Sequence, residues 1–324
     1  MTKHNDVDYF DSLRARLGIP GIIDVHTHFM PDPVLHKVWA YFDSGGPLIG
    51  ERPWPIVYRD DERVRLTTLR SFGVCAFTSL VYPHQPGMAT WLNDWAGEFA
   101  ATTPDCLQTA TFYPEHNAAG YVGAAIERGA RVFKVHIQVG GFHPCDPLLD
   151  EVWGMLEDAA IPVVIHCGSA PAPAEFTGPE PIAELLQRFP GLCLIIAHMG
   201  MPECSEFLDL AQTYPNIWLD TTMVFTDFSE SEKPFPRAER GRLRCLSERI
   251  LFGSDFPNIP YPYAHALSSL ERLGLGDSWL QKVCYRNAAR LFGIREPTPI
   301  PRSPTPMSVG SVTDSPLAAA TAIV

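Results

Sequence analysis

The stretch Gly21-Ile22-Ile23-Asp24-Val25-His26-Thr27-His28 joins a short apolar run to two histidines spaced two residues apart. In a β-strand the side chains alternate between the two faces, so His26 and His28 point the same way, about 7 Å apart along the chain. Two imidazoles that converge from the end of a buried strand can bind one divalent metal ion. Strands that bind no metal ion also carry such histidine pairs, so the prediction of a metal site depends on further ligands from other parts of the chain.

Seven further short segments rich in apolar and β-branched residues follow, and stretches with the apolar spacing of helices separate them. The eight segments that we expect to be strands are 22–28, 75–82, 107–113, 132–138, 163–167, 192–198, 217–222 and 250–254. The clearest helical stretches are 118–129, 148–160, 181–189 and 203–214. Buried strands alternating with helices predict an α/β fold with a parallel sheet. Eight such units favour a (β/α)₈ TIM barrel over a doubly wound sheet, and no G-x-G-x-x-G turn follows the first strand.

The composition divides the chain into three parts. We expect an N-terminal helical extension over residues 1–20, the barrel over 21–294, and a disordered tail rich in Pro, Ser and Thr over 295–324. Within the barrel, residues 31–61 form a long connection rich in Pro, Gly and aromatic residues. A long loop at this end of a barrel is typically a lid or a pocket wall, although a packed loop would show the same composition.

The net charge of the chain narrows the class of its partners, and its cysteines indicate the cellular compartment. The formal net charge of −12 argues against nucleic acid or an anionic membrane as the main partner, since both require a basic face. We find no secretion signal and no apolar run long enough to span a membrane. The eight cysteines contain no C-x-x-C pair, which is typical of reduced thiols in the cytoplasm. A small-molecule substrate is therefore expected. The sequence leaves the oligomeric state open, and a homodimer, the commonest soluble assembly, is compatible with it.

Four predicted strands end in a histidine or an aspartate. The first ends in His26 and His28, the fifth in His166, the sixth in His198, and the eighth in Asp255. In a parallel barrel these ends meet at one mouth, so we predict a metal site at the C-terminal face. His26, His28, His166 and Asp255 would bind one divalent ion, with Zn²⁺ preferred and Mn²⁺ or Fe²⁺ also suited. Asp255 could be ligand and base together, and His198 either another ligand or an acid–base group.

The same stretches resemble a known family. They are Ile-Asp-Val-His-Thr-His-Phe at 23–29, Val-Ile-His-Cys at 164–167, Ile-Ala-His-Met-Gly at 196–200, Leu-Phe-Gly-Ser-Asp-Phe-Pro at 251–257 and Tyr-Arg-Asn-Ala-Ala-Arg-Leu-Phe at 285–292. From about residue 21 to 294 the chain resembles the amidohydrolase-related (amidohydrolase 2) group of the amidohydrolase superfamily. This group contains hydrolases and non-oxidative decarboxylases of aromatic and muconate-type acids, such as the aminocarboxymuconate-semialdehyde type. The resemblance implies that His26, His28, His166 and Asp255 bind one metal ion and that His198 faces the substrate.

The fourth predicted strand carries Lys134 and His136 on one face. In two-metal relatives a carboxylated lysine on this strand bridges the ions, and Lys134 is its counterpart here. Other relatives have a lysine–histidine pair here without a second metal, and both residues would then line the pocket floor. Tyr82, at the end of the second strand, and Arg52, in the long connection, are further candidates for substrate binding. Arg59 and Arg63 beside that connection are alternatives for holding a substrate carboxylate.

Two enzyme reactions are compatible with this set of residues. The first is a metal-dependent hydrolase acting on a small, carboxylated or cyclic substrate through a metal-activated water, with Asp255 and His198 catalytic. The alternative is a metal-dependent decarboxylase of an aromatic or muconate-type acid. A second alternative is a non-catalytic barrel that binds a metal ion.

Overall fold

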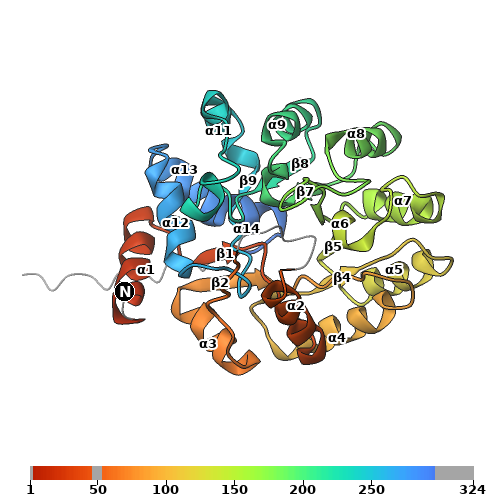
Figure 1. Ribbon diagram of the computed structural model, residues 1–324, viewed down its shortest axis with the longest axis horizontal. Coiled ribbons are helices and arrows are strands. Elements are labelled where there is room, and N and C mark those ends of the chain that lie inside the picture. The colour runs from red at the N-terminus through yellow and green to blue at the C-terminus, as the bar shows by residue number, and fades with distance from the viewer. Residues whose placement is uncertain (1–2, 46–52, 296–324) are drawn as a thin grey trace, which may run out of the picture.

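The computed structural model describes residues 3–45 and 53–295, with the backbone alone at 3–6. Helices surround a ring of short strands (Figure 1). The strands are β1 (Ile22–Asp24), β2 (Val74–Thr78), β3 (Cys106–Leu107), β4 (Thr109–Thr111), β5 (Val132–His136), β6 (Val163–His166), β7 (Leu194–Ile196), β8 (Ile217–Asp220) and β9 (Ile250–Leu251). Neighbouring strands pair in parallel in the orders β1-β2-β3 and β4-β5-β6-β7-β8-β9.

These nine strands occupy eight positions around a barrel. Only Gln108 separates β3 from β4, so the two are halves of the third strand. Beyond β1 and β9 the chain is joined by backbone hydrogen bonds from Val25 N to Phe252 O, at 3.0 Å, and from His28 N to Phe256 O, at 2.7 Å. The predicted TIM barrel is confirmed, and each of its eight strands overlaps the expected segment, with β2 and β3 beginning one residue earlier than expected.

The long helices cover the outside of the barrel, except α2, which lies in front of it (Figure 1). They are α1 (Lys3–Leu17), α2 (Asp32–Asp43), α3 (Glu62–Ser71), α4 (Ala89–Thr102), α5 (Ala118–Glu127), α7 (Asp150–Asp158), α8 (Pro179–Arg188), α9 (Cys204–Thr213) and α12 (Tyr263–Arg272). Shorter ones are α6 (Ile137–Gly140), α10 (Asp227–Glu230), α11 (Arg242–Cys245), α13 (Asp277–Gln281) and α14 (Asn287–Leu291). Single turns are η1 (Pro147–Leu149), η2 (Ala197–Gly200), η3 (Arg237–Gly241), η4 (Ser247–Arg249) and η5 (Lys282–Arg286). None of the helices in the described ranges is long and apolar enough to cross a membrane.

The N-terminal segment packs against the last helices of the barrel. Tyr9 of α1 donates a hydrogen bond to Glu271 of α12 at 2.6 Å, and Arg16 pairs with Asp277 of α13 at 2.5 Å. Phe10 of α1 is fully buried and lies 4.9 Å from the ring of Phe72. Residues 296–324, most of the predicted tail, lie outside the described residues.

The prediction of a loop over 31–61 is wrong for its first part, because residues 32–43 form α2. Leu35 and Trp39, four residues apart on one face, are buried against Met30, Ile56 and Val81. The Pro and aromatic content of the segment hid this helical spacing. In Figure 1, α2 lies in front of the barrel, near α4 and β2.

The barrel concentrates unusual backbone geometry at one end. Within residues 3–45 and 53–295, six non-glycine residues have positive φ, and five of them follow β7, β8 or β9: His198, Met199, Met223, Phe225 and Asp255. L-residues pay an energetic cost in this conformation, which surrounding contacts must offset. The C-terminal mouth therefore carries most of the strained backbone.

Asp24 links the beginning of the barrel to its end. One carboxylate oxygen accepts hydrogen bonds from the backbone N–H groups of His26 and Ser254, both at 3.1 Å, and the other accepts from the Tyr263 hydroxyl at 2.7 Å. Burial raises the pKa of Asp24 to about 7, although these hydrogen bonds oppose the shift.

Replacement of Asp24 should test this link. Asp24→Ala leaves two buried N–H groups and a hydroxyl without their acceptor, so we expect a loss of about 2–4 kcal/mol in unfolding free energy. Asp24→Asn keeps one oxygen acceptor and should lose less. Urea denaturation measures both, and Asp8→Ala, on the exposed face of α1, should change stability by under about 0.5 kcal/mol. An Asp24→Ala protein as stable as the control would contradict the assignment.

Candidate active site at the C-terminal mouth

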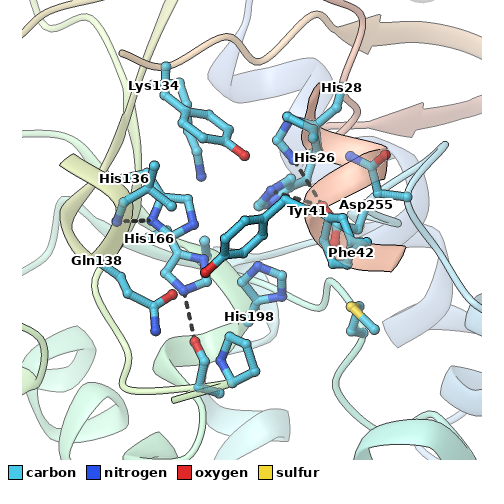
Figure 2. Close-up of a pocket in the computed structure, with 18 of the residues that line it drawn as sticks. His26, His28, Tyr41, Phe42, Lys134, His136, Gln138, His166, His198 and Asp255 are labelled. Carbon is cyan, nitrogen blue, oxygen red and sulfur yellow. Dashed lines mark hydrogen bonds and ion pairs between the residues drawn. The ribbon is translucent and has the colours of Figure 1, made fainter. Parts of the chain in front are cut away.

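A cavity of about 910 Å³ opens at the C-terminal ends of the strands. All of the predicted metal and catalytic residues line it: His26, His28, His166, His198 and Asp255. Lys134, His136 and Tyr82 also line it, whereas Arg52 lies outside the described residues. Figure 2 shows the histidines turned toward one another across this space.

His26, His28 and Asp255 form the tightest group. One ligand-capable atom from each lies within 4.8 Å of the others, and all three residues are buried. The Asp255 Oδ1 atom is 2.9 Å from His28 Nε2 and 3.7 Å from His26 Nε2. Two imidazole nitrogens and a carboxylate oxygen at these separations can be bridged by a single divalent ion.

Hydrogen bonds fix which nitrogen of each imidazole is available. His26 donates from Nδ1 to Asp220 Oδ2 at 2.9 Å, and His28 donates from Nδ1 to the Leu80 carbonyl at 2.9 Å. Each ring therefore turns the lone pair of its Nε2 toward Asp255. Burial, reinforced by the nearby Lys134, lowers the pKa of His26 well below its ordinary value and keeps the ring neutral. Metal-binding histidines are typically held in this way.

His166 lies beside this group and outside it. Its Nε2 donates to the Ala170 carbonyl at 3.0 Å, so Nδ1 is the nitrogen left with a lone pair. The ring stacks on His136 at a centroid distance of 3.8 Å and lies 4.9 Å from the ring of His198. His166 as a fourth ligand stays a prediction.

His198 follows β7 in the turn η2, at φ 54°. Its backbone N–H donates to Asp220 Oδ1 at 2.8 Å, and its Nδ1 donates to the Thr222 carbonyl at 3.0 Å. The Nε2 lone pair therefore faces the cavity, and burial lowers the pKa of the ring. A neutral His198 held in this way accepts a proton or binds an ion, but does not donate a hydrogen bond from Nε2.

Asp255 is the carboxylate of the group. Burial alone would raise its pKa, but the His28 ring, whose Nε2 lies 2.9 Å away, and the neighbouring rings of His26 and His198 hold the pKa below its ordinary value. It is therefore ionised and can act as ligand or base. Two residues earlier, position 253 requires glycine, because a Cβ there would lie 2.1 Å from Thr222 Oγ1 and 2.7 Å from His26 Cβ.

Asp220 was missed by the sequence analysis. Fully buried at the end of β8, it accepts hydrogen bonds from the His26 ring, from His198 N and from Thr222 N. The available signal was the one used for the other strands, an acidic residue directly after an apolar run. Because Asp220 would act on a bound ion only through the ring of His26, it is a positioning residue.

The β5 side of the cavity carries Lys134 and His136. The Lys134 Nζ is fully buried and has no hydrogen-bond partner. Burial lowers the pKa of Lys134 to about 8, against the raising effect of Asp220 and Asp255. His136 Nδ1 accepts the Val139 N–H at 3.3 Å, so in the neutral ring the proton is on Nε2. Burial also lowers the pKa of His136 well below its ordinary value.

The arginines considered as substrate anchors within the described ranges do not reach the cavity. Arg59 makes two hydrogen bonds with Asp43, at 2.7 and 2.5 Å, and Arg63 is exposed on α3. No arginine of the described ranges lines the cavity. A second group that could hold a metal, His143, Cys145 and Glu184, is partly exposed and does not line it either.

A TIM barrel with histidines and an aspartate gathered at the C-terminal ends of its strands has the architecture of a barrel enzyme. The family profile described as Amidohydrolase matches residues 23–294. The chain therefore belongs to the amidohydrolase family.

Solved structures with the same fold cover most of the chain. An uncharacterised TIM-barrel protein from Bordetella bronchiseptica is similar with a TM-score of 0.66 and 19% identity, over 84% of this chain and 98% of that one. Dihydroorotase from Campylobacter jejuni has a TM-score of 0.54 and 16% identity, over 86% and 84%. A probable 2-pyrone-4,6-dicarboxylic acid hydrolase from Acinetobacter baumannii, with citric acid bound, has a TM-score of 0.55 and 13% identity, over 84% and 99%. Comparison with curated protein sequences finds no significant match.

Removing the Asp220 carboxylate should weaken metal binding without touching a ligand. In Asp220→Asn we expect the affinity for Zn²⁺ to fall about 10–100-fold, because the His26 ring loses the acceptor that orients it. Competition with a chromogenic chelator measures the affinity. Asp227→Asn, at the exposed first residue of α10 after the same strand, is the matched control and should bind Zn²⁺ like the wild type. Equal affinities for both variants would contradict this role.

The neutral histidines predict an acid-sensitive fold. The pKa values of His26, His136, His166 and His198 are lowered by burial, so the unfolded chain takes up protons below about pH 6.5 that the folded metal-free protein does not. The unfolding free energy should therefore fall between pH 7 and 5.5, at most by about 1.4 kcal/mol per pH unit for each histidine. Asp24 has the opposite effect, but it is one group against four.

Urea denaturation of the metal-free protein at several pH values measures this dependence. His136→Gln removes one of the four histidines and should show a shallower fall than the wild type. Stability that stays level or rises on acidification would contradict the assignment of neutral rings.

Proposed function

We propose that the protein is a metal-dependent hydrolase that cleaves an ester, lactone or amide bond of a small organic substrate. The observation that carries the proposal is the convergence of His26 Nε2, His28 Nε2 and Asp255 Oδ1 within 4.8 Å at the wall of an open cavity. A structural metal site would be closed by its ligands and placed away from such a cavity. This position therefore favours catalysis over a non-catalytic metal-binding barrel.

The donor set fits the proposed ion. Neutral imidazoles and a carboxylate suit Zn²⁺ and also Mn²⁺ or Fe²⁺, and we propose one ion with His166 Nδ1 as a further ligand. A bound divalent ion would polarise a substrate carbonyl and lower the pKa of a water molecule.

The protein's own groups supply the proton transfers. Asp255 is ionised and can take the proton of the attacking water, then pass it to the leaving group. His198 presents a lone pair to the cavity, so it can serve as a second proton acceptor. On the sequence alone, His198 could also act as an acid. Because the Nδ1 proton is held by the Thr222 carbonyl, the ring would first have to take up a second proton on Nε2.

A metal-dependent decarboxylase is the second candidate. The observation that favours it is the unpartnered Lys134 Nζ, which lines the same cavity and could hold a substrate carboxylate. Release of CO₂ distinguishes this reaction from hydrolysis.

Metal removal and two ligand variants test the proposal. Chelation should abolish hydrolysis of a panel of aryl esters and lactones, and Zn²⁺ or Mn²⁺ should restore it. His28→Asn and Asp255→Asn should each lower kcat/KM by roughly 10³-fold or more, whereas His116→Asn, at an exposed position that does not line the cavity, should have no effect.

The measurements are metal content per chain, ultraviolet detection of product and a separate assay for CO₂. CO₂ release without hydrolysis would replace the first function by the second. A protein that binds no divalent ion on reconstitution would contradict both.

A further inference from the structure

The walls of the cavity differ sharply in character. Figure 2 shows Lys134, His136 and Gln138 along one side, with His28 and Asp255 along the other. Between and above them the lining is largely apolar, with four of the eight methionines and several aromatic rings: Met30, Met88, Met201, Met223, Phe42 and Trp54. A polar inner end and an apolar body are the two parts that a substrate must match.

Lys134 is the strongest indication of what occupies the inner end. A buried ammonium group without a hydrogen-bond partner costs several kcal/mol by order of magnitude, so native structures rarely leave one unused. Among the cavity-lining residues of the described ranges, Lys134 alone has a buried side-chain nitrogen or oxygen without a partner. An oxyanion of a ligand is the partner that would satisfy it.

His136 adds a second donor to the same side. It lies two residues after Lys134 on β5, so both side chains point to the barrel interior. Because the Val139 N–H occupies Nδ1, the neutral ring offers an N–H from Nε2. The ring is fixed by stacking on His166 at 3.8 Å and by the Tyr82 ring at 5.0 Å. A rigid N–H beside an ammonium group suits an oxygen that carries negative charge.

The expected net charge of the metal-bound site also favours an anionic group in the substrate. With one divalent ion bound, the two buried carboxylates of Asp220 and Asp255 would be outweighed by the charges of the ion and of the Lys134 ammonium group, so the inner end would carry a net positive charge. One anionic group of the substrate would balance it.

The rest of the cavity does not fit a second anion. The two other lysines that line it are the exposed Lys37 of α2 and Lys233, whose Nζ donates to the Pro171 carbonyl at 2.7 Å. The volume of about 910 Å³ lies near the upper end of the usual range for ligand pockets. Methionines are flexible and adapt to apolar groups of varied shape.

From these observations we infer that the site takes an amphiphilic substrate with a single oxyanionic head, held by Lys134 and His136, and an apolar body that fills the methionine- and aromatic-lined part of the cavity. The same arrangement disfavours a compact di- or tricarboxylate. The inference rests on the proposed function for the reaction, but it concerns recognition and can be tested by binding alone.

Three probes with the same phenylpropyl skeleton separate the features. They are 3-phenylpropionate, with one carboxylate; 3-phenylpropan-1-ol, with the same body and no charge; and 3-(4-carboxyphenyl)propionate, which adds a second carboxylate at the far end of the ring. Isothermal titration with the Zn²⁺-loaded protein should give at least about tenfold tighter binding of 3-phenylpropionate than of either other probe, the difference that a charged hydrogen bond makes. Equal or tighter binding of the dianion, or of the alcohol, would overturn the inference.

Two matched substitutions locate the head group. Lys134→Met should weaken binding of 3-phenylpropionate by about 10–100-fold while leaving the alcohol within about threefold. Lys37→Met makes the same change at the exposed rim lysine and should leave both probes within about threefold. If the two variants behave alike, Lys134 does not bind the head. If the wild type binds two Zn²⁺ ions and Lys134→Met binds one, Lys134 is a metal ligand and the inference fails.

The thermal midpoint of each variant checks folding, and the comparison of probes on the wild type does not depend on any variant.

Failure of the proposed hydrolysis can be distinguished from failure of the inference about substrate recognition. If 3-phenylpropionate binds as expected and no ester or lactone is cleaved, the recognition stands and the reaction assignment falls.

Discussion

The site depends on one buried carboxylate, that of Asp220. It accepts hydrogen bonds from the His26 ring, from the backbone of His198 and from Thr222, and it is fully buried. A charge in such a position is stable only when donors surround it, so these groups are fixed together. The tautomer of His26 follows directly, since Nδ1 must donate. Through the same carboxylate, the turn that carries His198 is tied to the strand beside it.

A second constraint is the strained backbone at the mouth. His198 and Asp255 both have positive φ, which is costly for residues with side chains. The barrel supplies the compensation, because its strands are buried on both faces and tied to one another by parallel ladders. Strain at a few residues of a rigid scaffold is typical of sites whose geometry matters more than their stability. The neutral, buried histidines are a second case in which the geometry of the site costs stability, since each lowers the unfolding free energy at acid pH.

Much of the fold and part of the site could be predicted from the sequence. Eight apolar segments, each bounded by turns, predicted eight strands, and His26, His28, His166, His198 and Asp255 all line one cavity as expected. The helix α2 was missed because its apolar positions lie among prolines and aromatic residues. Asp220 was missed because nothing in the sequence separates a carboxylate that orients a histidine from one that caps a strand. Both errors concern contacts made between distant segments.

By itself, the sequence determined the periodicity of the strands and the residue types at their ends, because the alternation of apolar and polar side chains is a local property of the chain. Only the tertiary structure decided which imidazole nitrogen is available, since that depends on acceptors such as Asp220, Leu80 O and Thr222 O, which come from other strands and loops. The same holds for the unpartnered Lys134 Nζ. Hydrogen bonding and desolvation are set by what surrounds a group in space, and spacing along the chain does not encode them.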